Sequence, residues 1–195
     1  MLPPAEILQD LVLVGGGHAH ALVLRMLAMR PIEGLRITLV SPASHTPYSG
    51  MLPGLVAGHY SFEQTHIDLQ RLCRWAGVRF LAAEVDGLCP EARELSLVGR
   101  PAINYDLLSI DIGSQPELDS VPGARVHTGP VKPVAGLWQR WEALEGRLAA
   151  GGNDRPCRVA VVGGGAGSVE LVLAMAHRLE GRAVEFDLFC GADSL

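Results

Sequence analysis

The sequence lacks closely spaced cysteines, long apolar runs and a cluster of basic residues, which several classes of protein require. Its four cysteines, Cys73, Cys89, Cys157 and Cys190, are too far apart to form a zinc motif or a neighbouring redox pair. No apolar run approaches the roughly 20 residues of a membrane-spanning helix, and the first residues lack the regions of a signal peptide. The net charge is −5, and the basic residues form no cationic stripe. We therefore expect a cytoplasmic protein with no transmembrane segment and no nucleic-acid partner.

Histidine does not replace cysteine as a metal ligand. His18 and His20 are two residues apart, and His59 and His66 flank the expected start of a helix. No Cys or carboxylate joins either pair at ligand spacing. We expect no metal site.

The composition is that of a folded globular chain. Of its 195 residues, 48% are apolar and 19% are charged. This is too apolar for disorder and too often interrupted by charges for a membrane bundle. The length suits one core, or one domain and part of another.

The start of the chain follows the pattern strand, glycine turn, helix, strand. An apolar run at 11–14 meets three glycines at 15–17, an apolar segment of helical length covers 19–29, and a β-branched run covers 35–40. This order is typical of a βαβ unit whose two strands are parallel.

The same order recurs near the end of the sequence. An apolar run at 158–162 meets glycines at 163–165, and a helical segment at 169–179 precedes a second strand at 183–190. This repeat is the most informative feature of the chain, because either copy alone is a weak signal.

The chain between the two units predicts a small meander and two further helices. Strand-like segments separated by turns should form a β-meander beside the parallel sheet. Apolar residues at helical spacing predict helices, and the tryptophans of the second helix should pack in a core. The expected strands are 78–85, 93–98 and 103–110, the helices are 65–75 and 134–150, and residues 42–61 should form a functional loop.

A glycine turn between a buried strand and a helix suits a pyrophosphate. It brings backbone N–H groups and the positive end of the helix dipole to one point, and glycine has no side chain to block the approach. In the first turn, Gly15 and Gly17 hold the first two glycine positions of the GxGxxG fingerprint, and His20 holds the third.

The second turn repeats this arrangement. Gly163 and Gly165 hold the first two glycine positions, and Ser168 holds the third. A single turn of this kind is as often structural as functional, but two copies that each head a βαβ unit predict two dinucleotide sites.

Neither unit has the acidic residue that usually binds the ribose at the end of the second strand. Ser41 takes this position in the first unit and keeps one hydrogen bond. The second unit ends its strand at Phe189-Cys190-Gly191. The sequence therefore does not choose between NADH and NADPH.

Because it has both glycine turns, the chain resembles the two-dinucleotide-binding-domain flavoproteins, which form the pyridine nucleotide–disulfide oxidoreductase superfamily. Three motifs are similar to its type II NADH dehydrogenase-like branch, in particular to the flavoprotein fused to selenophosphate synthetases. They are VGGGHAH at 14–20, YSGMLPG at 48–54 and YDLLSIDIGS at 105–114. The resemblance implies an α/β fold: a Rossmann-like FAD-binding domain with a parallel sheet and small β-meander, then the start of a second Rossmann-like, NAD(P)-binding unit.

The resemblance also assigns residues to two cofactors. Those implied for FAD lie in the first turn, at the end of the second strand, in the YSGMLPG loop near the isoalloxazine ring, near the adenine, and in the Asp-Ile-Gly turn that stands where the superfamily has Ala-Thr-Gly. They are Gly15, Gly16, Gly17, His18, Ala19, Ser41, Pro42, Ser49, Gly50, Val85, Asp111 and Gly113. Those implied for NAD(P)H are Gly163, Gly165 and Ala166.

Glu170 is the expected catalytic residue. The superfamily often places a glutamate here, close to the contact between nicotinamide and flavin. An acid near a helix N-terminus is equally well explained by the helix dipole, and the sequence leaves both interpretations open.

The expected function is an FAD-dependent oxidoreductase that takes hydride from NAD(P)H. The chain has no CxxxxC pair after the second strand, so electrons should pass to a quinone-like or other diffusible acceptor rather than to a dithiol. The alternative is a truncated, non-catalytic nucleotide-binding remnant or interaction module. A homo-oligomer joined through open strand edges, and the peripheral membrane contact implied for the full-length family, stay open.

These expectations divide the chain into three parts. Residues 1–133 should form the N-terminal part of the FAD-binding domain, and 134–154 a connecting helix and linker. Residues 155–195 should form a truncated NAD(P)H-binding unit.

Overall fold

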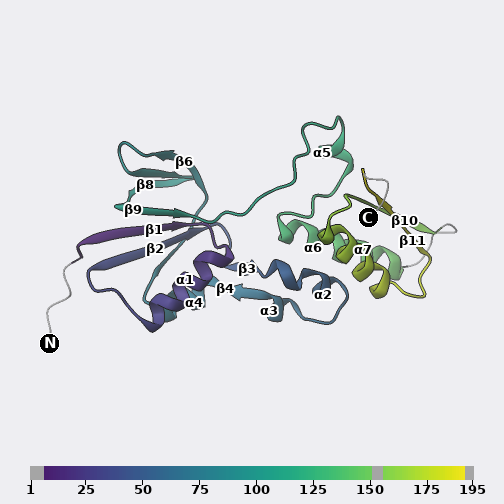
Figure 1. Ribbon diagram of the computed structural model, residues 1–195, viewed down its shortest axis with the longest axis horizontal. Helices are drawn as coiled ribbons and strands as arrows, with labels where there is room; N and C mark the ends of the chain where they lie inside the picture. Colours follow the sequence, from purple (N-terminus) through teal and green to yellow (C-terminus); the bar gives the residue numbers. More distant parts are fainter. Residues whose placement is uncertain (1–6, 151–155, 192–195) are drawn as a thin grey trace. The chain divides into compact units, whose positions relative to one another are not determined.

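The computed structural model describes residues 7–150 and 156–191 (Figure 1). Contacts within the chain divide it into two compact units. The first comprises residues 1–46 and 66–113, and the second comprises residues 47–65 and 114–195. The expected domain boundary after residue 133 stays a prediction, and the one between 154 and 155 lies outside the described residues.

The first unit is built on a four-stranded parallel sheet. Its strands are β1 (Gln9–Val14), β2 (Leu35–Ser41), β5 (Arg79–Ala82) and β9 (Leu107–Ile110), in the order β5-β2-β1-β9. Val14 lies opposite Val40 on one side and Ile110 on the other. The first βαβ unit therefore has the predicted parallel strands, and β1, β2 and β9 end at the same edge of the sheet.

Alternate residues of these strands cover two different cores. Leu13 and Leu39 pack with Leu24 of α1 (His18–Met29) and with Leu69 and Cys73 of α4 (Leu69–Ala76). The helices thus cover one face of the sheet, as Figure 1 shows. Neighbouring valines of β1 and β2 face the other way because successive side chains of a strand point to opposite faces.

The other face is covered by an antiparallel meander of three strands. These are β6 (Val85–Cys89), β7 (Glu94–Leu97) and β8 (Arg100–Asn104), in that order. Leu95 and Leu97 of β7 are buried against Val12 and Val40 of the parallel sheet. The structure confirms the predicted Rossmann-like α/β fold with a small meander.

The boundaries of the predicted meander are partly wrong. The expected strand 78–85 supplies β5 of the parallel sheet, and the expected strand 103–110 is divided between β8 and β9. The division has a physical cause at Asp106, whose backbone N–H donates to the Asp10 carbonyl at 2.9 Å and whose carboxylate accepts from the Asp10 N–H at 2.8 Å. Pro101 lies in the edge strand β8, where a missing N–H is tolerated.

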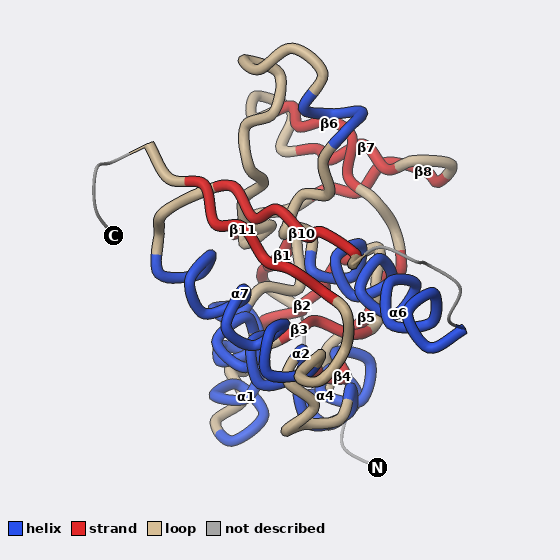
Figure 2. Tube along the Cα trace, turned by 90° about the vertical axis from the view of Figure 1, so that its right-hand side faces the viewer, coloured by secondary structure: helices blue, strands red, loops and turns tan. Residues whose placement is uncertain are grey.

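The second unit contains the second βαβ repeat and the helices packed with it. Strands β10 (Cys157–Val162) and β11 (Val184–Phe189) pair in parallel, and α7 (Ala166–Arg178) connects them, as Figure 2 shows. The predicted helix at 134–150 is confirmed as α6 (Val134–Ala150). Trp141 is buried and Trp138 packs beside it, so both tryptophans belong to a core, as predicted.

Two predictions for the chain between β2 and β5 are partly wrong. The expected loop at 42–61 contains β3 (His45–Pro47), the 3-10 helix η1 (Ser49–Met51) and α2 (Leu52–Val56). The predicted helix at 65–75 is divided into α3 (Phe62–Thr65), β4 (His66–Asp68) and α4. The Asp68 carboxylate accepts from the N–H of Arg71 at 2.8 Å, which caps α4 and fixes its start at Leu69.

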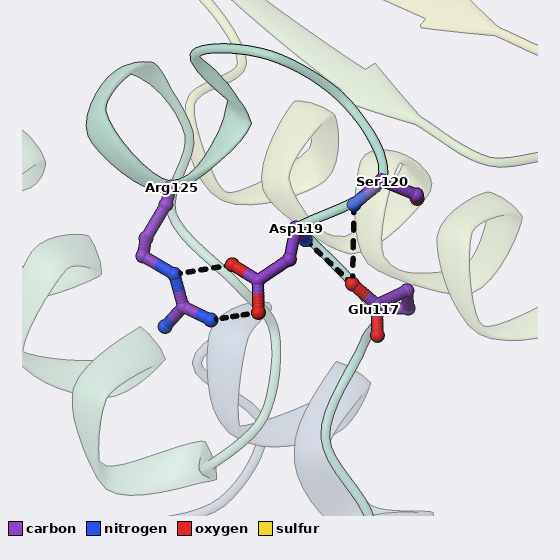
Figure 3. A network of polar contacts seen from close by, with 4 residues as sticks. All are labelled: Glu117, Asp119, Ser120 and Arg125. Carbon is purple, nitrogen blue, oxygen red and sulfur yellow. Dashed lines mark hydrogen bonds and ion pairs between the residues drawn. The ribbon is translucent and has the colours of Figure 1, made fainter.

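The segment between β9 and α6 is held by local polar contacts. The Arg125 guanidinium, in the short helix α5 (Ala124–His127), donates two hydrogen bonds to the Asp119 carboxylate (Figure 3). The Glu117 carboxylate accepts from the N–H groups of Asp119 and Ser120.

None of the helices in the described part of the chain is long and apolar enough to cross a membrane.

Candidate dinucleotide-binding sites

The first glycine turn joins β1 to α1 and closes against the end of β9. Gly15 has a φ of +91°, and its N–H donates to the Val40 carbonyl at 2.8 Å. A β-carbon at Gly15 would lie 2.3 Å from the carbonyl oxygen of Asp111. Glycine is therefore required here both by conformation and by space.

Asp111 also accounts for the second fingerprint glycine. A β-carbon at Gly17 would lie 2.3 Å from Cγ, Oδ1 and Oδ2 of Asp111. The Asp111 carboxylate accepts from the N–H of His20 at 3.1 Å, and its carbonyl accepts from the N–H of Gly17 at 3.2 Å. The first turn is thus shaped around Asp111, which the sequence placed in the site only by resemblance.

His20 takes the third glycine position and has a structural role that sequence reasoning missed. The side chain is 2% exposed. Its Nδ1 donates to the Gly15 carbonyl at 2.7 Å, since a carbonyl can only accept, and Nε2 lies 2.9 Å from Oγ of Ser109 in β9. His20 therefore links the glycine turn to the neighbouring strand. A polar residue on the apolar face of a predicted helix was the only signal of this role.

Ser41 lies beside the first turn, at the end of β2, as predicted. Its side chain is buried, and Oγ donates to the Ala43 carbonyl at 3.0 Å. A β-carbon at Gly16 would lie 3.3 Å from this Oγ and 2.2 Å from Cδ1 of Leu69. The hydroxyl oxygen keeps its capacity to accept a hydrogen bond, which suits a ribose hydroxyl.

The other residues implied for FAD are distributed over both units. His18 and Ala19 lie in the first turn of α1, and Pro42 follows β2. Val85 is the first residue of β6. Gly113 lies two residues after Asp111 and has a φ of +75°. Ser49 and Gly50 lie exposed in η1 of the second unit.

The second glycine turn has the same connection but is more open. Gly163 has a φ of +125°, and its N–H donates to the Phe189 carbonyl at 2.8 Å. A β-carbon at Gly163 would lie 2.9 Å from Oγ of Ser168, whereas one at Gly165 would meet no atom of the structure within 4 Å. The N-terminus of α7 therefore leaves space for an anionic group.

Ala166 and Glu170 lie in the same helix but at different distances from its N-terminus. Ala166 is the first residue of α7, next to the Gly165 cap. Glu170 is exposed and lies beyond the first turn, which contains no acidic residue. The dipole interpretation of Glu170 is weaker for this reason, because the dipole acts mainly within the first turn of a helix.

The described residues contain no group of three or more His, Cys, Asp or Glu side chains that could hold a metal ion. Cys73 is buried in the first unit, and burial raises the pKa of its thiol to about 11. This thiol belongs to the helix–sheet core and is unsuited to redox chemistry near neutral pH.

Comparison with known proteins identifies the family. The pyridine nucleotide-disulphide oxidoreductase family profile matches residues 9–185, which include both glycine turns. The chain belongs to this family. Family members typically bind FAD and NAD(P)H.

A curated relative has low sequence identity to this chain. The alternative NAD(P)H-ubiquinone oxidoreductase C1 of Arabidopsis thaliana, chloroplastic/mitochondrial, is 26% identical over 185 residues, which are 87% of this chain and 35% of that protein. The chain thus spans about a third of the length of this curated relative.

Solved structures share the fold. NDH2 from Plasmodium falciparum in complex with NADH has a TM-score of 0.76 at 18% identity, over 92% of this chain and 41% of that one. Reduced Bacillus anthracis CoADR-RHD has a TM-score of 0.77 at 20% identity, over 95% of this chain and 33% of that one.

Proposed function

We propose that the chain is part of an FAD-dependent oxidoreductase that takes hydride from NAD(P)H, with FAD at the first glycine turn and NAD(P)H at the second. The observation that carries this proposal is the repetition of one connection. Val14 pairs with Val40 and Val162 pairs with Phe189, and in both units the glycine after the first strand donates to the carbonyl of the pairing residue. A lone turn of this kind would support a structural role equally well.

The second turn fits the pyrophosphate of NAD(P)H. Its glycines leave the N-terminus of α7 accessible, and the hydroxyl of Ser168 lies next to Gly163. Gly163, Gly165 and Ala166 would hold the pyrophosphate through backbone N–H groups, which the helix dipole supports. We assign Glu170 to this unit as the candidate catalytic residue near the nicotinamide.

The backbone of the first turn fits the binding of FAD, but the Asp111 side chain does not. Gly15 and Gly17 form the strand–helix connection, Ser41 offers a hydroxyl to the ribose, and Val85 is assigned to the adenine. The Asp111 carboxylate lies at the same helix end to which a pyrophosphate would bind. When bound, FAD supplies a ring that accepts hydride and releases electrons singly or in pairs, and the chain orients it.

The acceptor is proposed to be a quinone or another diffusible molecule. One support is the name of the Arabidopsis thaliana relative, an NAD(P)H-ubiquinone oxidoreductase. The other is the sequence after β2, where residues 42–61 contain no cysteine for dithiol chemistry. The closer resemblance to the flavoprotein fused to selenophosphate synthetases, the cytoplasmic location and the choice between NADH and NADPH stay predictions.

Reconstitution with FAD tests the proposal. The purified chain is incubated with FAD, freed of excess flavin, and titrated anaerobically with NADH and NADPH while the flavin absorbance is followed. The proposal predicts bound flavin that bleaches on addition of one or both nucleotides and recovers when a quinone is added. Retained flavin that neither nucleotide reduces would limit this chain to nucleotide binding, and failure to retain flavin would contradict its assignment as an FAD enzyme.

A further inference from the structure

The negative charge at the N-terminus of α1 comes from Asp111, at the end of β9. Helix α1 has no acidic residue in its first turn, and its cap residue, Gly17, has no side chain. The Asp111 carboxylate lies over Gly17 and accepts from the N–H of His20. This is the arrangement of an N-terminal helix cap, supplied by a residue distant in sequence.

The backbone holds this carboxylate in place from both sides. The Asp111 N–H donates to the Val14 carbonyl at 2.8 Å, and the Asp111 carbonyl accepts from Gly17. His20 binds the Gly15 carbonyl and approaches Ser109, two residues before Asp111. Asp111 is half-buried. Its position is therefore set by strand pairing and by the buried His20, rather than by a mobile surface loop.

The second turn has no comparable group among the residues that the structure describes. A β-carbon at Gly165, the cap of α7, would meet no atom within 4 Å, whereas one at Gly17 would meet the Asp111 carboxylate. The two turns share a backbone connection but differ in charge. One is occupied by a carboxylate of the protein, and the other is open.

We propose that Asp111 is the internal anion of the first turn: it stabilises the turn without ligand and weakens the binding of the FAD pyrophosphate, so that this residue sets how readily the site fills. The inference rests on the proposed function, which assigns FAD to this turn. A pyrophosphate and a carboxylate need the same N–H donors and repel each other at close range. The bound state therefore requires the Asp111 side chain to turn away from the N-terminus of α1.

The test compares the wild-type chain with Asp111→Asn and with a matched control, Asp106→Asn. Both substitutions remove one negative charge, at opposite ends of β9, and Asp106 is exposed. Binding of FAD is measured by titration calorimetry, and thermal unfolding is measured without ligand and with inorganic pyrophosphate. If Asp111→Asn does not fold, Asp111→Ser supplies the neutral side chain.

The expected result for Asp111→Asn is FAD binding about tenfold tighter than wild type, the size of a charge interaction at a partly buried helix end. Its unfolding temperature without ligand should be lower, and pyrophosphate should raise that temperature more than in wild type. Asp106→Asn should keep the FAD affinity of wild type within about twofold. Equal or weaker FAD binding by Asp111→Asn would overturn the proposal.

Failure of the proposed function gives a different result. If no form of the chain binds FAD, the assignment of FAD to this turn fails, and pyrophosphate then decides the role of Asp111. A larger pyrophosphate stabilisation in Asp111→Asn than in wild type would support the internal anion. Equal stabilisation in both would overturn it.

Discussion

The position of Asp111 explains why the first turn requires glycines even when no ligand is bound. At both fingerprint positions an added β-carbon would meet atoms of Asp111, its carbonyl at Gly15 and its carboxylate at Gly17. The two glycines should therefore respond differently to substitution, because a side chain can be removed and a carbonyl cannot.

Gly17→Ala tests this difference. Gly17 has a φ of −67° and a ψ of 175°, which any residue adopts, so the expected loss of about 1–3 kcal/mol in unfolding free energy comes from the clash with the carboxylate. The double variant Gly17→Ala with Asp111→Ala should lose less than the sum of the two single variants, by about 1 kcal/mol or more. Denaturant unfolding of the four proteins measures this coupling.

Gly15→Ala is the control for that experiment. Its φ of +91° and the approach of the Asp111 carbonyl are backbone properties. Asp111→Ala should therefore not rescue it. Rescue of Gly15→Ala, or additive losses for Gly17→Ala, would show that the carboxylate does not explain these glycines.

Cys73 gives a second prediction for a single residue. Burial raises the pKa of its thiol to about 11, so the thiol stays protonated at pH 8 and solvent does not reach it. Iodoacetamide at pH 8 should label the exposed Cys89 in the native protein and leave Cys73 unmodified, as read by peptide mass spectrometry. Labelling of both in denaturant is the control, and fast labelling of native Cys73 would show that this core opens readily.

At the residue scale, the sequence identified the glycines but not what surrounds them. Gly15, Gly17, Gly163 and Gly165 could be found because a strand–glycine–helix order is local. The role of His20 could not, because it depends on Ser109 in a strand 89 positions away. In the sequence, His20 is only a departure from the glycine fingerprint. In the structure, its buried side chain connects the glycine turn to β9.

At the scale of elements, the two βαβ units were predictable because the order of strand, glycine turn, helix and strand is local in the sequence and occurs twice. The chain between them was not, because its elements are short and depend on partners. Strand β6 contains Asp86 and Gly87, which interrupt apolar alternation, and it is paired with β7. Helix α2 is five residues long, and its burial comes from packing with α7.

The pairing of β1 with β2 should depend on pH through Asp10. Hydrogen bonds from the Arg36 guanidinium, at 2.5 and 2.6 Å, and its charge hold the pKa of the Asp10 carboxyl below its usual range. A lowered folded-state pKa means that the pair stabilises the fold above the unfolded pKa of about 4, and that this is lost as pH falls through the folded pKa.

Asp10→Asn measures this contribution. The variant should unfold at a lower temperature than wild type at pH 7, and the difference should shrink as pH falls below about 4. Glu33→Gln, an exposed residue before β2, is the matched loss of one negative charge. A difference between wild type and Asp10→Asn that is constant from pH 7 to about pH 3 would contradict the role given to the Arg36 pair.

At the scale of the whole molecule, the chain carries two strand–glycine–helix connections in two compact units, and it spans 35% of a curated relative. Family membership and fold follow from the sequence match and the structural similarity. The hydride transfer that we propose requires a different dinucleotide at each turn.

Amide hydrogen exchange of the chain with FAD alone and with NADH alone tests this assignment. We expect FAD to slow exchange at residues 15–20 of the first unit and NADH to slow exchange at residues 163–168 of the second, since each pyrophosphate would bind the N–H groups of its own turn. Protection of the same turn by both ligands, or of neither turn by either, would contradict it.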